Sequence, residues 1–337
     1  MAVRNRSFLV FVVAVALSVV SAGAQKATGK IKERTGGSIH AVLWRNPTDI
    51  ELRNLFYGAG GKEHEPRGPF QFVEEDLEGT SPKFVVKDHD GVKWKVKLGQ
   101  EAGPETAASR LVWAAGYFTT DDYFISNLKV EGLPARLHRG RKLIGADGSV
   151  PNVRLKRPMK DEKKVGTWQW RQSPFTGTRE LNGLKVMMAL INNWDLKDEN
   201  NAVYEQDHQR IYLVSDLGAS FGTAGRSWPR YKTKGNLEFY RRSPFFRDIE
   251  ADTVDFRVPA RPSFEYLVNP KEYIRRIHLE WIGKDVPRDD AKWMGMLLAR
   301  LSPAQLRDAF LAAGYSPEEA EGFASVLQTR IAKLTDL

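Results

Sequence analysis

Two runs of strand-forming residues flank position 90, and in the second of them apolar and polar residues alternate. The runs are 83–88 and 92–98, and the residues between them end in Asp90-Gly91, a pair typical of a tight hairpin turn. In the second run, four apolar residues at every other position share one face: Val92, Trp94, Val96 and Leu98. Lysines fill the positions between them. The pattern predicts a β-hairpin with one buried face.

Two later segments have the apolar spacing of amphipathic helices. The first opens at Gly103-Pro104 and ends at Gly116, with proline and glycine where helix starts and ends favour them. The second covers Thr178 to Asn192, and a short β-branched run at 210–216 follows it. From about residue 262 the chain is again helical in pattern, with two Ser-Pro pairs that are typical of helix starts.

The first 24 residues have the three parts of a secretory signal. Arg4 and Arg6 give a positive start, residues 8–20 are almost unbroken apolar, and Ala22-Gly23-Ala24 offers the small residues that a signal peptidase reads. The apolar stretch is shorter than the roughly 20 residues that span a bilayer. The sequence predicts a signal peptide at 1–24, export to the periplasm or the medium, and no transmembrane anchor after cleavage.

The composition is that of a globular chain without disulfides. The chain has 337 residues, no cysteine, 42% hydrophobic residues and a net charge of +9. Its stability must therefore come from a hydrophobic core alone. The positive charge favours anionic partners such as phosphate groups. No basic run with interleaved aromatic residues indicates nucleic acid, so none is expected as a partner.

One group of residues has the chemistry of phosphoryl transfer, which needs a loop over the phosphates, a cation, metal ligands, and a carboxylate beside the attacking hydroxyl. Directly after the second helix the chain reads Asn193-Trp-Asp195-Leu-Lys197-Asp-Glu-Asn200. This spacing matches the protein-kinase catalytic loop, in which Asp is the base and Asn, five residues on, holds a metal. Asp216-Leu-Gly218 lies sixteen residues after Asn200, beyond the predicted strand. A hairpin of this length would return Asp216 to Asn200, so that the two share a cation.

Together with upstream motifs, these residues resemble the HipA-type and phosphatidylinositol-kinase-like branch of the kinase fold. The likeness covers roughly residues 79–222, through a glycine loop at 79–83, a hairpin ending in Val96-Lys97 and a helix opened by Glu105. The resemblance implies the following roles: nucleotide binding by Gly79, Thr80, Ser81, Lys83 and Lys97, catalysis by Asp195 with Lys97 and Glu105, and metal binding by Asn200 and Asp216. It also implies ATP or another nucleotide and Mg²⁺ or Mn²⁺ as cofactors, with an unidentified hydroxyl-bearing acceptor.

The same resemblance implies an α+β fold with two lobes, in which a small N-lobe sheet near residues 70–130 precedes a helical C-lobe from about residue 165. The expected divisions are a signal peptide (1–24), an N-terminal extension (25–69), a kinase-like domain (70–261) and a C-terminal helical extension (262–337). The chain departs from the kinase pattern at Trp194, where kinases usually have Arg, and at Leu217, where they have Phe. Lys95, on the same strand face as Lys97, is a rival for the phosphate-binding role.

Two other functions stay open. A secreted pseudokinase or phospho-ligand-binding protein would keep the fold without turnover. A serine esterase would use Gly218-Ala-Ser220-Phe-Gly222, which spells a nucleophile elbow and follows the predicted strand. Another glycine-rich stretch, Gly58-Ala-Gly-Gly-Lys62, looks suited to phosphate but lacks the Walker spacing, and we interpret it as a surface loop.

Overall fold

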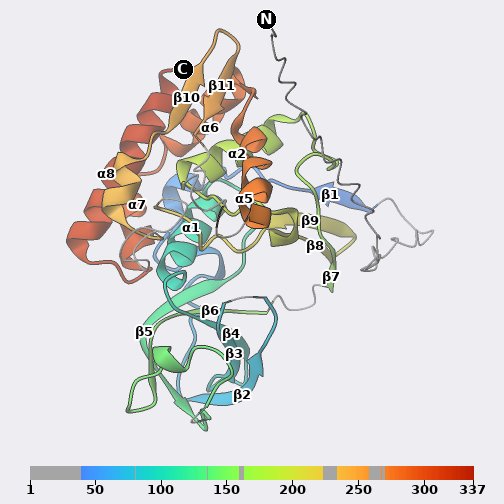
Figure 1. Cartoon of the computed structure of the whole chain (residues 1–337). Helices are drawn as coiled ribbons and strands as arrows, with labels where there is room; N and C mark the ends of the chain where they lie inside the picture. Colours follow the sequence, from blue (N-terminus) through green and yellow to red (C-terminus); the bar gives the residue numbers. More distant parts are fainter. Residues whose placement is uncertain are drawn as a thin grey trace, which may run out of the picture. The chain divides into compact units, whose positions relative to one another are not determined.

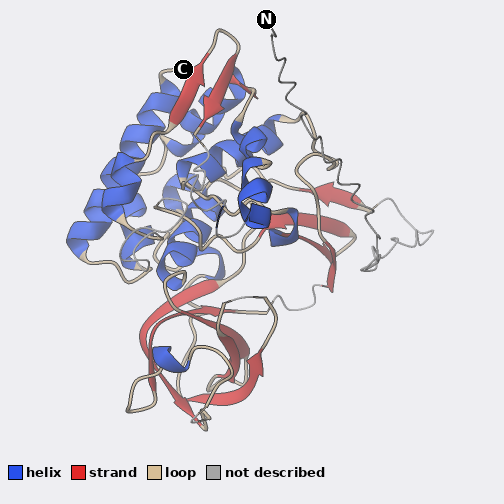
Figure 2. Ribbon diagram, viewed as in Figure 1, coloured by secondary structure: helices blue, strands red, loops and turns tan. Residues whose placement is uncertain are grey.

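The computed structural model of the chain describes residues 39–79, 81–134, 136–158, 163–222, 234–257, 267 and 270–337. The predicted signal peptide lies outside the described residues, as does Thr80 of the predicted phosphate loop. Residues 37–337 form one compact unit. Within it, Figures 1 and 2 show a β-barrel at one end and a mainly helical region at the other, which we call the β lobe and the helical lobe.

The β lobe is a closed five-stranded barrel in the order β2-β3-β4-β6-β5. Its elements are β2 (Phe70–Asp76), β3 (Lys83–Lys87), β4 (Lys93–Leu98), β5 (Asp122–Glu131) and β6 (Ser149–Lys156), with helix α1 (Ala102–Ala114) between β4 and β5 in the chain. The antiparallel β3–β4 pair confirms the predicted hairpin. Phe84, Trp94 and Val96 are almost fully buried inside the barrel. Closing the sheet leaves no free strand edge and gives these apolar side chains a common interior.

The barrel extends beyond the region near 70–130 that the sequence predicts, because β6 belongs to it. The sequence around β6 is polar and contains prolines, which hides its period-two pattern. In the structure Val150, Val153 and Leu155 are fully buried, and β6 pairs with both β4 and β5. The strand was hard to recognise because Arg154, between two of these residues, is also buried.

The helical lobe combines helices with two small sheets. The helices are α2 (Arg179–Leu190), α3 (Leu237–Arg242), α5 (Pro270–Ile277), α6 (Arg288–Leu298), α7 (Pro303–Leu311) and α8 (Pro317–Thr335). The first sheet has the order β1-β9-β8-β7, formed by β1 (His40–Val42), β9 (Gln209–Val214), β8 (Asn201–Gln206) and β7 (Lys163–Gly166). The second contains β10 (Phe246–Ile249), β11 (Thr253–Phe256) and β12 (Val286–Pro287). Short 3₁₀ turns cover Ile50–Leu52, Gly58–Gly60, Arg141–Leu143, Asp198–Asn200 and Glu280–Gly283.

Local sequence signals explain where the helices begin. The Thr178 hydroxyl accepts a hydrogen bond from the Leu181 amide at the start of α2. Ser302 and Ser316 each form a capping box, with a proline in the first turn of α7 and α8. The predicted starts of α2, α7 and α8 are therefore confirmed, and each capping side chain satisfies a backbone amide that the helix leaves unpaired. Helix α1 begins at Ala102, two residues before the proline that was expected to open it.

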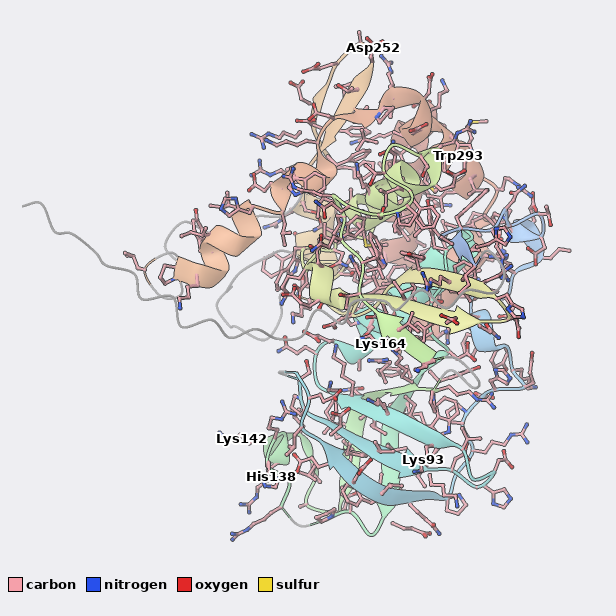
Figure 3. The ribbon with its side chains drawn as sticks, turned by 90° about the vertical axis from the view of Figure 1, so that its right-hand side faces the viewer. Lys93, His138, Lys142, Lys164, Asp252 and Trp293 are labelled. Atoms are coloured by element: carbon pink, nitrogen blue, oxygen red, sulfur yellow. The ribbon has the colours of Figure 1, made fainter. Side chains whose placement is uncertain are left out.

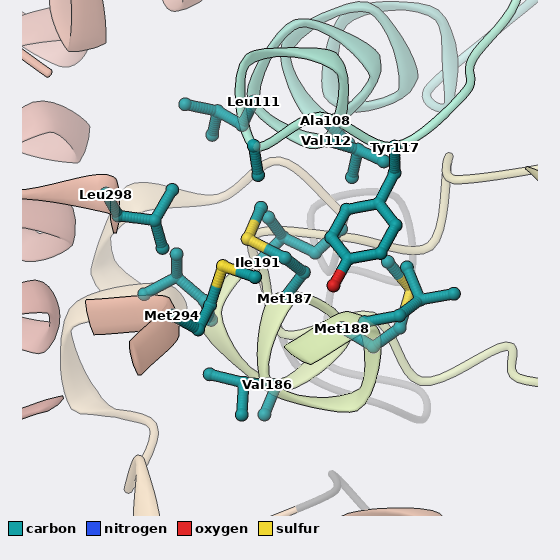
Figure 4. Packing of buried hydrophobic residues seen from close by; sticks show 14 of the residues in the cluster. Ala108, Leu111, Val112, Tyr117, Val186, Met187, Met188, Ile191, Met294 and Leu298 are labelled. Atoms are coloured by element: carbon teal, nitrogen blue, oxygen red, sulfur yellow. The ribbon is translucent and has the colours of Figure 1, made fainter. Parts of the chain in front are cut away.

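One hydrophobic core joins most of the helical lobe to α1. Figure 4 shows Met187 and Ile191 of the α2 region facing Leu111 of α1 and Met294 of α6. Leu43, Ile50 and Leu55, which precede the barrel in the chain, are in the same core, as are α7 and α8. The N- and C-terminal parts of the described chain thus stabilise the lobe that carries the predicted catalytic loop.

The described residues have the predicted two-lobed α+β architecture. Within the same residues, no helix is both long enough and apolar enough to cross a membrane.

Candidate active site

Lys97 lies at the centre of the candidate site. It is the last residue but one of β4, and only 4% of its surface is exposed. Its ammonium nitrogen lies 2.9 Å from Glu105 Oε2, 2.7 Å from Asp216 Oδ1 and 2.6 Å from Glu101 Oε2. These carboxylates belong to α1 and to the segment after β9. One buried cation therefore joins the β lobe to the helical lobe.

The surroundings keep Lys97 charged. Burial by itself would lower the pKa of Lys97, but the carboxylates of Glu105, Asp216 and Glu101 outweigh it and raise that pKa above its usual value. A buried ammonium group needs such partners, because an isolated charge in a protein interior is strongly unfavourable. Lys97 is thus a permanent positive charge, suited to a phosphate group.

Helix α1 brings two of the carboxylates to Lys97. Glu101 is the N-cap residue of α1 and Glu105 lies in its first turn, so both are at the positive end of the helix dipole. Burial opposes ionisation of Glu101, but Lys97 and Lys234 dominate and lower its pKa to about 2. Lys234, from the helical lobe, forms an ion pair with Glu101. Glu101 therefore lies between two lysines from different lobes.

Glu105 is held by a second buried cation. Its Oε1 lies 3.1 Å from Arg154 Nη2, and Arg154 Nη1 lies 3.0 Å from Asp122 Oδ1. Burial raises the pKa of Glu105, against the opposing effects of Arg154 and Lys97. Arg154 lies directly opposite Lys97 in the β4–β6 pair. This series of ion pairs, Lys97–Glu105–Arg154–Asp122, therefore fixes the orientation of the Glu105 carboxylate.

Asp216 reaches Lys97 because the backbone turns sharply after β9. Its φ of 63° lies in the left-handed region, which Asp adopts more readily than most residues. Gly218 makes the turn possible, since a Cβ there would lie 2.6 Å from the Glu101 Cβ. Burial would raise the pKa of Asp216, but the neighbouring Lys97 lowers it. The side chain is ionised and 44% exposed, so it can also accept a ligand.

The three carboxylates form a set that could hold a divalent metal. One oxygen each from Glu101, Glu105 and Asp216 lie within 4.8 Å of one another. Oxygen-only donors are those that Mg²⁺ and Mn²⁺ prefer. The donor set fits the metal that the resemblance implies, although it includes Glu101, which the sequence did not suggest.

Asn200, the other predicted metal ligand, is held near Asp216 by hydrogen bonds between its backbone carbonyl and the preceding residue, Ser215. The Ser215 amide donates to the Asn200 carbonyl at 2.8 Å, and the Ser215 hydroxyl donates to it at 2.7 Å. The β8–β9 hairpin pairs Asn201 with Val214, which explains the spacing between Asn200 and Asp216. The Asn200 side-chain amide donates to the Asp195 carbonyl at 2.7 Å. Its Oδ1 is the atom that could bind a metal.

Asp195 lies in the loop that joins α2 to β8. Its backbone amide donates to Asn193 Oδ1 at 3.0 Å, and its Oδ1 lies 3.1 Å from Lys197 Nζ. The Trp194 amide donates to the Ala219 carbonyl at 3.3 Å, so this loop runs beside the segment that carries Asp216. The structure therefore places the predicted base next to the predicted metal ligands, on the helical-lobe side of the site.

A pocket of about 320 Å³ opens beside Lys97. Its lining is rich in basic residues: Lys83, Lys95, Lys97, Arg154, Lys156 and Lys164. Gly79 and Ser81 of the predicted phosphate loop also line it, and Lys164 lies where the two lobes approach (Figure 3). Asp195 and Asn200 are not among the lining residues. Such a cluster of cations favours a highly charged anion.

The two candidate lysines of β4 differ in environment. Lys95 has a side chain that is 51% exposed, and it pairs with Asp76 at 3.2 Å. Lys97 is buried among three carboxylates. This geometry favours Lys97 over Lys95 for the phosphate-binding role.

Sequence reasoning missed several residues of the site. Glu101 could have been noticed, because it precedes Glu105 by four residues and so lies on the same helix face. Arg154 and Lys156 could not, because β6 was not recognised as a strand. Burial, with Arg154 as the main charged neighbour, lowers the pKa of Lys156 to about 8. Nothing in the local sequence singles out Lys234.

Ser220 does not fit the esterase alternative. The residue is fully buried, and its hydroxyl donates to the Leu217 carbonyl at 2.7 Å. A nucleophile elbow instead exposes its serine at a strand-to-helix turn. The hydroxyl of Ser220 closes a local turn.

Comparisons with known proteins find likeness at the level of structure alone. No protein-family model matches the chain, and no curated protein does. The structure is similar to that of a proinflammatory kinase of Helicobacter pylori, CtkA, with 10% identity and a TM-score of 0.34 over 80% of this chain and 99% of that one. It is also similar to Golgi casein kinase, with 9% identity and a TM-score of 0.39 over 87% and 76% of the two chains. At TM-scores this low, neither likeness supports an inference about function.

Proposed function

We propose that this protein is an exported phosphotransferase of the kinase type, which uses a nucleotide with Mg²⁺ or Mn²⁺ to phosphorylate a hydroxyl-bearing acceptor. One observation carries the proposal. The Lys97 ammonium contacts both Glu105 and Asp216, although Asp216 is 119 positions away in the chain. Phosphoryl transfer is catalysed mainly by positioning and electrostatics, and the contact supports the proposal because a lysine that binds phosphate would need a metal-binding carboxylate beside it.

Each residue has a definite task in this reaction. Lys97 neutralises charge on the nucleotide phosphates, and the Glu105–Arg154 pair keeps its ammonium group in place. Gly79 and Ser81, from the loop between β2 and β3, and Lys83, the first residue of β3, border the pocket. Asp216 and Asn200, with Glu101 as a third oxygen donor, would hold the metal. When bound, the metal would balance the negative charge of the phosphate oxygens.

Asp195 is the proposed base. The acceptor oxygen forms a bond to the terminal phosphorus, while the bond from that phosphorus to the bridging oxygen breaks. The acceptor proton moves to the Asp195 carboxylate, and the nucleoside diphosphate leaves. Lys197, whose Nζ lies 3.1 Å from Asp195 Oδ1, can contact the transferred group.

The finer parts of the proposal have separate support. The HipA-type and phosphatidylinositol-kinase-like assignment is supported by the order of the motifs from Gly79 to Asp216. Export is supported by the charged, apolar and small-residue parts of residues 1–24. An exported kinase would meet its nucleotide and its acceptor outside the cytoplasm.

The decisive experiment is calorimetric titration of ATP with Mn²⁺ into the wild type and into Asp216→Ala. We expect affinity to fall at least about 100-fold, or ~3 kcal/mol. Lys97 keeps two carboxylate partners, so the variant should melt like the wild type. Asp336→Ala, at an exposed aspartate in the last turn of the chain, is the matched control. Unchanged affinity in a folded Asp216→Ala protein would refute the metal assignment.

Turnover needs its own measurement. Wild type incubated with terminally labelled ATP and Mn²⁺ should transfer label to an acceptor or release it as phosphate, and Asp195→Asn should not. If the wild type binds nucleotide without any transfer, the non-catalytic alternative is correct.

A further inference from the structure

A second pocket, of about 270 Å³, lies behind helix α1. Arg110 of α1 lines it, together with aromatic and apolar side chains, among them Phe56, Tyr123, Phe124 and Leu311, and with one carboxylate, Glu65. The pocket shares no lining residue with the one beside Lys97. Glu105 and Arg110 are five residues apart on the same helix, so their side chains point about 140° apart around its axis. The two pockets are therefore on different sides of α1.

Among the described residues, Arg110 is a buried cation without a direct ion-pair partner, and the carboxylates of Asp122 and Asp121 act on it only from a longer distance. Only 2% of its surface is exposed, and among the described residues no carboxylate oxygen lies within 4.0 Å of its guanidinium. Its Nε is buried without a hydrogen-bond acceptor. Its guanidinium lies over the Tyr123 ring, with 5.4 Å between Cζ and the ring centre. A buried guanidinium in this state is unfavourable unless something else accepts its hydrogen bonds.

Arg154 and Arg330, two other buried arginines of the described residues, have partners for their terminal nitrogens, although Arg154 Nε, like Arg110 Nε, lacks an acceptor. Arg154 pairs with Glu105 and Asp122. Arg330 donates hydrogen bonds to carbonyl oxygens at the ends of two helices, including Leu190 at 3.0 Å and Tyr240 at 3.1 Å. For these two arginines, protein oxygens accept hydrogen bonds or ion pairs from the terminal nitrogens. At Arg110 a pocket takes their place.

The glycine-rich segment Gly58–Lys62 closes over this guanidinium. Gly58 has a φ of +71°, and a Cβ there would lie 2.3 Å from Arg110 Nη1. The Tyr123 hydroxyl donates to the Gly61 carbonyl at 2.7 Å, which holds the segment against β5. The segment that looked suited to phosphate in the sequence therefore packs on the arginine. This close approach is possible because glycine has no side chain.

We propose that the Arg110 pocket binds a small organic anion, a carboxylate or phosphate monoester carried on an apolar body. The planar guanidinium matches the two oxygens of either group. The aromatic walls would bury the rest of the ligand, as in most small-molecule sites. The site does not depend on the proposed phosphotransferase activity.

Phenyl phosphate and benzoate are the probes that test the site, with uncharged phenol of similar size for comparison. Each is titrated calorimetrically into the full chain as wild type, Arg110→Met and Arg136→Met. Arg136 is an exposed arginine of the same lobe and serves as the matched control. We expect saturable binding of at least one anion by the wild type and by Arg136→Met. Binding should be at least about 10-fold weaker to Arg110→Met, and phenol at least about 10-fold weaker than that anion.

Location is tested with Lys97→Met and with ATP plus Mn²⁺. The probe should still bind to Lys97→Met and should not be displaced by the nucleotide. Loss of binding in that variant would mean that the probe occupies the other pocket, and the proposal would be wrong. It would equally be wrong if no anion bound to the wild type, if phenol bound as well as the anions, or if folded Arg110→Met bound normally. If Arg110→Met does not fold, a crystal structure of the wild type with phenyl phosphate replaces that test. We expect the phosphate group to contact Arg110, and a phosphate bound elsewhere would show that the proposed site is wrong.

Discussion

Arg330 in the helical lobe and Lys97 at the meeting of the two lobes are both buried cations, but they are neutralised in different ways. Arg330 of α8 has no carboxylate partner within 4.0 Å among the described residues. It donates to carbonyl oxygens of the α2 end and of the α3 end, and it lies 4.1 Å above the Tyr240 ring. Lys97 instead contacts three ionised side chains.

The difference separates a buried charge that stabilises the fold from one that is suited to ligand binding. Helix C-termini leave carbonyls without partners and carry partial negative charge, so a fixed arginine there stabilises the packing of three helices. Those acceptors belong to the backbone and cannot move away. Carboxylate side chains can exchange the Lys97 ammonium for a metal ion, which leaves that ammonium free to bind phosphate. The buried ion-pair cluster is therefore where binding is expected, and the arginine-carbonyl cluster is where stability is expected.

The largest expected effect is the loss of stability in Arg330→Met. The substitution leaves buried carbonyls of the α2 and α3 ends without their donor, and we expect a loss of about 3 to 5 kcal/mol in the free energy of unfolding. Urea denaturation measures it. Arg307→Met, at a half-exposed arginine that pairs with Glu321 at 3.8 Å, is the control and should change stability by less than about 1 kcal/mol. If Arg330→Met lost no more stability than the control, Arg330 would not have the structural role that we assign to it. If the folded variant bound ATP more weakly than the wild type, the role of Arg330 would not be purely structural.

An intermediate, pH-dependent effect is expected for Glu101→Gln. The pKa of Glu101 is held at about 2, below its usual 4.5, so folding favours the charged form. Its stabilising contribution is complete above pH 4.5 and is lost as the pH falls through 2. The variant should be less stable than the wild type near pH 6, by of order 1 to 3 kcal/mol, and the difference should shrink steadily toward pH 2.

Urea denaturation of both proteins across that pH range is the measurement. Glu321→Gln, at an exposed glutamate, is the control and should follow the wild type throughout. A difference between wild type and Glu101→Gln that stays constant with pH would mean that the charge of Glu101 is not what matters.

The smallest effect is expected for Lys95→Met. Lys95 and Asp76 form a half-exposed ion pair, and such pairs contribute less than about 1 kcal/mol. We expect ATP affinity to change less than about threefold, while Lys97→Met should remove measurable binding. Titration of ATP with Mn²⁺ compares the two variants. If Lys95→Met lost as much affinity as Lys97→Met, Lys95 would be the phosphate-binding residue.

The elements that were predicted well are those that depend on neighbours in the chain. The 83–98 hairpin follows from alternation around a tight turn, and α2 follows from apolar spacing after a capping threonine. The proximity of Asn200 and Asp216 also follows from short-range structure, because one β-hairpin joins them. The predicted roles of Asp195, Asn200 and Asp216 stay predictions, but their proximity comes from this short-range geometry.

The parts that could not be predicted depend on what lies opposite a residue in space. β6 carries Arg154 among its buried residues, and an arginine there is stable only because Glu105 and Asp122 face it from other elements. Arg110 has the sequence surroundings of an ordinary helical arginine. Its burial behind Gly58 comes from a segment about fifty residues earlier in the chain.

By itself, the sequence determined the local elements, the helix caps and the order in which the candidate catalytic residues occur, because hydrogen bonds between near neighbours and apolar periodicity act over a few residues. Only the tertiary structure decided which charges are buried and which partners neutralise them. The reason is electrostatic: the energy of a charge depends on its burial and on the opposite charges within a few ångströms, and these come from distant parts of the chain.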